Sequence, residues 1–192
     1  MQSAQKNKTM TNENKEDSFL PPDYKEPEGN YMRFQDGENV FRVLSSAVTG
    51  FEYWNTDNKP VRSKTLWKST PKDIRVEKGK ATRINHFWVF AVWSYRAEKV
   101  QILEVTQKTI MSAMTAYIQN KQWGNPKNYD FTVTKTGSGF DTEYVVMANP
   151  HSPAPQVEFD INLEALFEEN GDPFSGRADK EFDNFNKEPS AQ

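Results

Sequence analysis

Hydrophobic positions alternate with a period of two through most of residues 39–148, which predicts strands. The first such segment, NVFRVLSSAVTGFEYW at residues 39–54, is apolar, β-branched and aromatic. It predicts one long strand that is interrupted at Ser45 and Ser46 or bent at Gly50. The segments 86–95 and 100–105, joined by the short turn 96–99, predict a hairpin.

The hydrophobic period changes once, in TQKTIMSAMTAYIQNKQWG. Its apolar residues recur at the spacing of one helical face, with Thr106 as a reasonable N-cap and Gly124 just past the end. These residues are Ile110, Ala113, Met114, Tyr117 and Ile118. Two further strands are predicted at 129–136 and 142–148, with GSGFD as the hairpin loop between them.

This order places one helix between the third and fourth of five strands. It predicts a mainly β fold, and specifically the OB-fold, a five-stranded, partly open Greek-key barrel. The loops after its first and fourth strands bind oligonucleotides. Here the first of these loops is long and basic, and the second is GSGFD.

The flanks of the chain are polar. Residues 1–30 predict a disordered N-terminal arm, residues 31–150 the OB-fold domain, and residues 151–192 an acidic C-terminal tail. Within the tail, FDINLEALFEENG predicts a short helix capped by Asp160 and ended by Gly171.

Composition narrows the chemistry. The chain has no Cys and two His, His86 and His151, so disulfides and thiolate metal sites are excluded and no zinc-protease spacing occurs. KTGSGFD is not a phosphate-binding loop, because no GK[ST] follows it. No apolar run is long enough for a membrane span. We therefore expect no catalytic residues, no cofactor and no metal, and a protein of the cytoplasm.

Charge is distributed unevenly along this chain of net −3. Residues 31–150 carry 17 bases and 11 acids, a net of +6, whereas residues 151–192 carry a net of −7. Residues 59–83 hold nine Lys and Arg against two acids, with a Trp among them. A loop of this length is typical of a functional segment.

Bases interleaved with Trp favour nucleic acid, because phosphates bind cations and unpaired bases stack on rings. In the aromatic strand, Trp88 shares a face with His86 and Ser94, and we favour that face for ligand over the one with Trp93 and Tyr95. The candidate single-strand contacts are Tyr53, Trp54, Lys59, Arg62, Lys64, Trp67, Lys68, Arg75, Arg83, Trp88 and Trp93. In the tail, Phe182 and Phe185 are candidate docking groups for protein partners, and the acidic tail could also compete with nucleic acid.

The segments FRVLSSAVTGFEYWNTDNKPVRSK, HFWVFAVWSYRAEKVQILEVTQKTI, WGNPKNYDFTVTKTGSGFDTEYVVM and NPHSP resemble the OB-fold single-stranded DNA-binding proteins of tailed bacteriophages. The resemblance covers roughly residues 31–155. It implies sequence-independent binding of single-stranded DNA in phage replication, recombination and repair, in the cytoplasm of the host cell. It also implies an acidic tail that recruits replication and recombination proteins. Two features of the family are missing. Relatives of the T4 type carry a zinc subdomain with Cys and His ligands, which a chain without Cys lacks. Several such proteins end their acidic tail in Phe, whereas this chain ends EPSAQ.

Two other functions remain open from the residues. One is a protein-interaction adaptor, in which the barrel and the Phe-bearing tail bind replication proteins. The other is an RNA-binding module, because no feature of the sequence distinguishes RNA from DNA by a contact to the 2′-hydroxyl.

Overall fold

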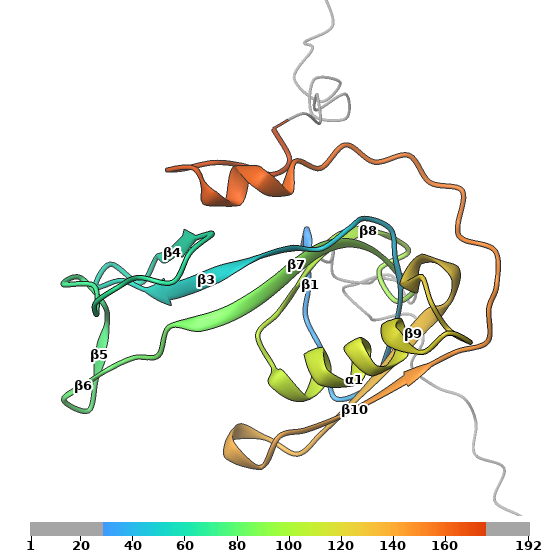
Figure 1. Cartoon of the computed structure of the whole chain (residues 1–192), viewed down its shortest axis with the longest axis horizontal. Coiled ribbons are helices and arrows are strands. Elements are labelled where there is room, and N and C mark those ends of the chain that lie inside the picture. The colour runs from blue at the N-terminus through green and yellow to red at the C-terminus, as the bar shows by residue number, and fades with distance from the viewer. Residues whose placement is uncertain (1–28, 176–192) are drawn as a thin grey trace, which may run out of the picture.

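The computed structural model of the chain describes residues 29–175, which are mainly β with a single α-helix (Figure 1). The long strands are β2 (Gly37–Val43), β3 (Val48–Trp54), β7 (Asn85–Ser94), β8 (Lys99–Val105), β9 (Asp130–Thr136) and β10 (Glu143–Ala148). The helix α1 (Lys108–Gln119) lies between β8 and β9 in the chain, as the hydrophobic pattern predicts. It begins after Gln107, whose side chain makes no capping bond, rather than at the expected cap Thr106.

The predicted long first strand is two strands, broken at residues 44–47. Ser45 Oγ accepts a hydrogen bond from the backbone N–H of Ala91 at 2.9 Å and donates one to the carbonyl of Ser46. A serine side chain thus replaces a backbone partner where the ladder is interrupted. Gly50, the other expected bend, lies within β3 instead.

Both halves of this interrupted strand pair with β7. Val43 is opposite Val92 in β2, and Val48 is opposite Val89 in β3, so β7 continues past the break. The strand order is β1-β8-β7-β2-β9-β10, where β1 (Tyr31–Met32) runs parallel to β8 and the other pairs are antiparallel. The described sheet is therefore open and mixed, with β1 and β10 at its ends.

The main core lies between the concave side of this sheet and α1. Its fully buried side chains come from all the long strands except β3 and β10, and from one stripe of the helix. They include Phe41, Val92, Val105, Ile110, Phe131 and Val133. The apolar face of the strands and the apolar stripe of α1 pack against each other here, so that each amphipathic element buries its hydrophobic side.

The basic stretch between β3 and β7 is not a bare loop. It contains β4 (Pro60–Ser63), which pairs with β3, and the small hairpin of β5 (Val76–Glu77) and β6 (Lys80–Ala81). We call residues 55–84 the arm, because they project away from the rest of the sheet (Figure 1). Charge and proline content hid these short strands from the sequence pattern.

The segment after β10 also differs from the expected loose tail. Arg42, fully buried, donates to Asp130 at 2.6 Å and to the backbone carbonyl and side-chain hydroxyl of Ser152, which fastens the NPHSP segment to β2. Further on, the 3-10 helix η3 (Leu163–Phe167) packs on the sheet, and its cap is Asn162 rather than Asp160. No helix among residues 29–175 has the length and apolar character to cross a membrane.

Candidate nucleic-acid interface

The ribbon formed by β3 and the first half of β7 has two different faces. Residues that are directly opposite in the register point to the same side of a sheet. Thr49 is opposite Trp88 and Phe51 is opposite His86, so these four side chains share one face, which we call the track face. The alternate positions form the covered face, including Gly50 opposite Phe87.

Aromatic rings follow one another along the track face. Trp88 Nε1 donates to His86 Nε2 at 3.2 Å, and the other ring nitrogen of His86 donates to the Gly50 carbonyl at 2.8 Å. The His86 ring lies 5.2 Å from the ring of Phe51. These contacts set the orientation of three partly exposed rings before any ligand is bound. We call this row, continued by Trp67, the aromatic track.

Tyr53 fixes the far end of the track rather than extending it. Its ring meets Trp67 edge to face at 4.9 Å, and its hydroxyl donates to Asp73 at 2.8 Å across the arm. Burial, together with that carboxylate, raises the pKa of Tyr53 to about 12, so the hydroxyl remains a donor at neutral pH. At 4% exposure, Tyr53 offers no free ring face. It positions Trp67, which is half-buried.

The C-terminal segment occupies the covered face. Phe167 of η3 stacks on Phe87 at 5.8 Å, and Leu163 and Leu166 join the same cluster. A Cβ at Gly50 would clash with the Phe167 ring, so the close approach of η3 requires glycine there. Because six acids and no bases lie in residues 151–175, most of the −7 of the tail is carried by this folded-back part of the chain.

The nine Lys and Arg side chains of the arm, which include all six cations predicted to bind phosphate, divide into two groups. Arg62 lies between two carboxylates, 2.8 Å from Glu104 and 3.3 Å from Glu52, with only 15% of its side chain exposed. Lys64 pairs with Glu164 at 2.6 Å and lies 4.2 Å from the centre of the Phe167 ring, and Arg75 pairs with Glu77. By contrast, no ion pair within residues 29–175 involves six other arm cations: Lys59, Lys68, Lys72, Lys78, Lys80 and Arg83.

Glu52 gives the Arg62 cluster its electrostatic character. It is buried, and burial and the neighbouring Glu104 carboxylate raise its pKa to about 7, while Arg62 acts in the opposite direction. The Glu52 Oε2 and Arg62 Nε atoms are close but do not form a hydrogen bond. The Arg62 guanidinium therefore lies beside two carboxylates and is little exposed, so it is poorly placed to contact a phosphate of a bound strand.

The other predicted contacts lie apart from the track. Trp54 is 39% exposed at the end of β3, on the side opposite Tyr53, with the Arg75 guanidinium 5.8 Å from its ring. Trp93 lies five residues beyond Trp88 on β7, about 16 Å along the strand. Trp54 and Trp88 therefore belong to opposite faces of the ribbon. Phe182 and Phe185 fall outside the described residues.

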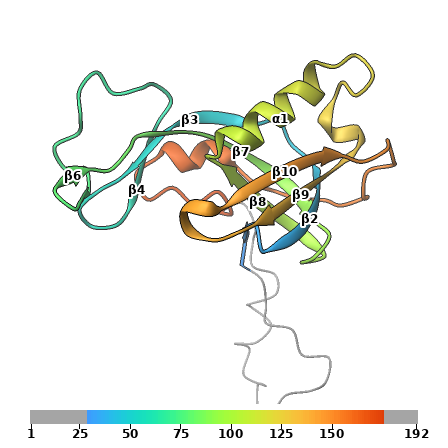
Figure 2. The same ribbon diagram turned by 90° about the horizontal axis from the view of Figure 1, so that it is seen from below.

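One exposed ring was missed in the sequence. Phe140 in η2 (Gly139–Asp141), at the tip of the β9–β10 hairpin, is 106% exposed. Figures 1 and 2 show this tip and the arm extending on the same side of the molecule. The available signal was a Phe that follows the two glycines of GSGFD, a turn too short to bury it. Gly137 cannot be replaced easily, since its φ is +73° and a Cβ would clash with the Asp141 carbonyl.

Comparison of the chain with protein-family models, with curated proteins and with solved structures finds no match. Within residues 29–175, no group of three or more His, Asp or Glu side chains is arranged to hold a metal ion.

Proposed function

We propose that this protein binds single-stranded DNA without sequence preference, as the phage proteins it resembles do. The observation that carries the proposal is the aromatic track beside an arm whose Lys and Arg are largely free of acidic partners. Rings that are oriented in advance offer stacking to unpaired bases, at about 1–3 kcal/mol per base. The free cations supply the counterion release that dominates affinity for a phosphate chain.

The strand pairing supports an OB-fold as the framework of this site. In this assignment β2 and β3 are the first strand, β7 and β8 the second and third, and β9 and β10 the fourth and fifth. The arm then follows the first strand and the Phe140 hairpin follows the fourth. These are the two loops that flank an oligonucleotide on OB-folds, across the face of strands two and three.

The arrangement favours single strands over duplexes. Stacking on Trp88 or Trp67 needs a base whose ring faces are accessible, and in a duplex those faces are occupied by neighbouring base pairs. The track also offers few polar groups that could read base edges, which favours binding of any sequence. In this proposal Lys59, Lys68 and Arg83 contact phosphates, while Arg62 and Tyr53 keep the arm in place.

A protein-interaction adaptor is the second candidate, and a separate surface favours it. Val145 and Met147 are 56% and 48% exposed on β10, which ends the described sheet. An exposed apolar edge strand can pair with an extended peptide of another protein. This role does not conflict with DNA binding, because these residues do not belong to the track.

The test is a titration of intrinsic Trp fluorescence with oligo-dT, oligo-rU and duplex DNA. We expect strong quenching by oligo-dT and weaker quenching by duplex DNA. The oligo-rU titration measures how far the protein prefers DNA over RNA. Trp67→Ala should weaken oligo-dT binding by about 1–3 kcal/mol if its ring stacks on a base.

The matched control is Trp93→Ala, which removes the same side chain far from the track. Melting temperatures of both variants separate lost stacking from lost stability. If wild-type protein gives no response to oligo-dT, or if Trp93→Ala weakens binding as much as Trp67→Ala, the proposed site is wrong.

A further inference from the structure

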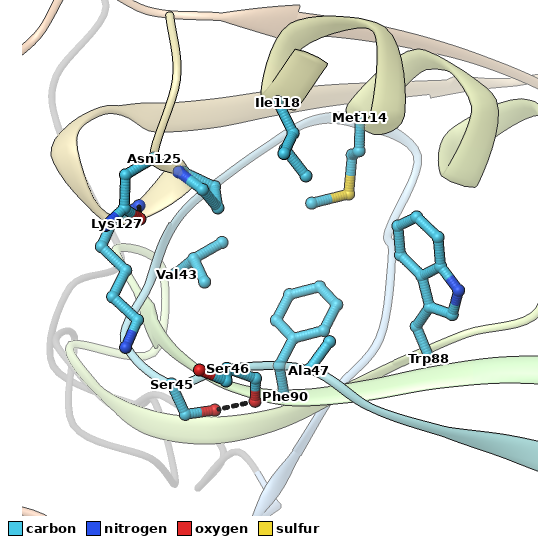
Figure 3. Close-up of a pocket in the computed structure, with 11 residues that line it drawn as sticks. Val43, Ser45, Ser46, Ala47, Trp88, Phe90, Met114, Ile118, Asn125 and Lys127 are labelled. Atoms are coloured by element: carbon cyan, nitrogen blue, oxygen red, sulfur yellow. Dashed lines mark hydrogen bonds between the residues drawn. The ribbon is translucent and has the colours of Figure 1, made fainter.

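A pocket of about 270 Å³ lies under α1, at the break between β2 and β3 (Figure 3). Its walls are apolar and include Phe90 from β7 and Met114 from α1. Trp88 forms the wall on one side, and Lys127 from η1 (Pro126–Asn128) lies on the opposite side. Since Trp88 also begins the aromatic track, the pocket continues the track into the body of the protein.

The rim of the pocket carries hydrogen-bond donors that are not used within the described residues. The Asn125 side-chain oxygen accepts from the backbone N–H of Lys127 at 3.0 Å, which leaves the amide nitrogen as a free donor. No partner within residues 29–175 is found for the Lys127 ammonium. Ser45 differs, because its hydroxyl is engaged on both sides with Ala91 and Ser46.

We propose that this pocket receives one nucleobase of the bound strand, a base that carries a carbonyl oxygen. The inference rests on the proposed function and adds to it one base position, at the end of the track, that disfavours adenine, while the rest of the strand is bound without sequence preference. An apolar pocket with a few polar groups at its edge is the usual form of a small-ligand site. Donors at the rim match carbonyl oxygens, which thymine has and adenine lacks.

Size and continuity both favour a base as the occupant. At about 30 Å³ per water, the volume corresponds to about nine waters, which is more than enough space for a pyrimidine ring, whose bonded atoms each occupy less space than a water. A base that enters beside Trp88 leaves its neighbours in line with His86 and Phe51. Lys127 on the other side then lies within reach of the strand as it leaves the pocket.

The first experiment uses the wild-type protein and oligo-dT of the shortest length that still binds fully. One residue at a time is replaced by an abasic nucleotide, and in a second series by dA. We expect one position at which the abasic substitution lowers affinity about tenfold, within the range of one lost stacking contact. At that position dA should also bind more weakly than dT, whereas at the other positions dA and dT should be equivalent.

The second experiment fills the pocket. Ala47→Trp introduces a large ring from the exposed end of the strand break, and Ile118→Trp introduces one from α1. The control is Ala116→Trp, on an exposed face of the same helix that does not line the pocket. The melting temperature of each variant is measured first, and whichever filling variant retains the wild-type value is carried forward.

The proposal requires that filling the pocket lowers oligo-dT affinity about tenfold and removes the position dependence of the abasic series. Ala116→Trp should retain both properties. If wild type binds oligo-dT but no position is sensitive, or if folded filling variants bind like the control, the pocket does not hold a base and an apolar side chain of a protein partner becomes its candidate occupant. If wild type does not bind oligo-dT at all, the proposed function fails first.

Discussion

Glu52 links the electrostatics of the arm to the stability of the fold. Glu52 is 4% exposed, and the pKa of its carboxyl is raised from 4.5 to about 7, chiefly by burial and then by Glu104. The folded state therefore binds a proton more tightly than the unfolded state does. The stabilisation that the folded state gains from the protonated Glu52 carboxyl is complete below pH 4.5, decreases as pH rises, and is lost above about pH 7.

Replacing this carboxyl by a neutral amide of similar shape removes the decrease in stability that wild type shows as pH rises. A shift from 4.5 to about 7, at about 1.36 kcal/mol per pKa unit, sets an upper value near 3 kcal/mol. Because Glu104 shares the charge of the cluster, we expect Glu52→Gln to raise the free energy of unfolding by about 2 kcal/mol at pH 8. Below pH 4.5 the variant and wild type should be equally stable. Arg62 keeps Glu104 as its partner in this variant.

The assay is urea unfolding at several pH values between 4 and 8.5, followed by fluorescence. Glu143→Gln is the matched control, because Glu143 is exposed at the start of β10 and has no ion pair among the described residues. The reasoning is refuted if the stability difference between Glu52→Gln and wild type is the same at pH 4 and pH 8. It is also refuted if Glu52→Gln is less stable than wild type at pH 8.

Three further predictions concern salt, the core and the tail. Lys68→Gln should reduce the slope of log affinity for oligo-dT against log salt by about 0.7, whereas Arg62→Gln should leave the slope unchanged, and equal slopes for the two would contradict their assignments. Arg42→Met leaves Asp130 without its buried cation and should lower the free energy of unfolding by about 3–5 kcal/mol in a denaturant titration, against no change if the pair were solvated. Ending the chain after Ser175 removes a net charge of only −1, so oligo-dT affinity at low salt should change by less than about twofold, and a large increase would show that residues 176–192 compete with DNA.

The sequence by itself determined the elements that have a strong repeating pattern. The aromatic strand β7, the hairpin it makes with β8 and the position of α1 all follow from alternation or from a helical stripe. These patterns are legible because each side of an element must be either buried or exposed along its whole length. The charge asymmetry was also visible, since it depends on composition alone.

Only the tertiary structure decided which charges and rings are available. Arg62, Lys64 and Lys68 look equivalent in the sequence, yet the first two meet carboxylates from β8 and η3, and the third meets none. Their partners lie up to about a hundred residues away along the chain, and no local pattern encodes such a pairing. Likewise the faces of Trp54 and Trp88 depend on the register of β3 against β7, where a shift of one residue exchanges the two sides.

The C-terminal segment is a second case in which the sequence did not predict a tertiary contact. Its acids and prolines are typical of a solvated tail, and its few apolar residues are too sparse to indicate burial. In the folded chain, Leu163, Leu166 and Phe167 cover Phe87 on β7 because that strand is hydrophobic on both faces and the main core can bury only one. A strand that is apolar on both sides required a second cover, and which segment supplies it was settled by packing in three dimensions.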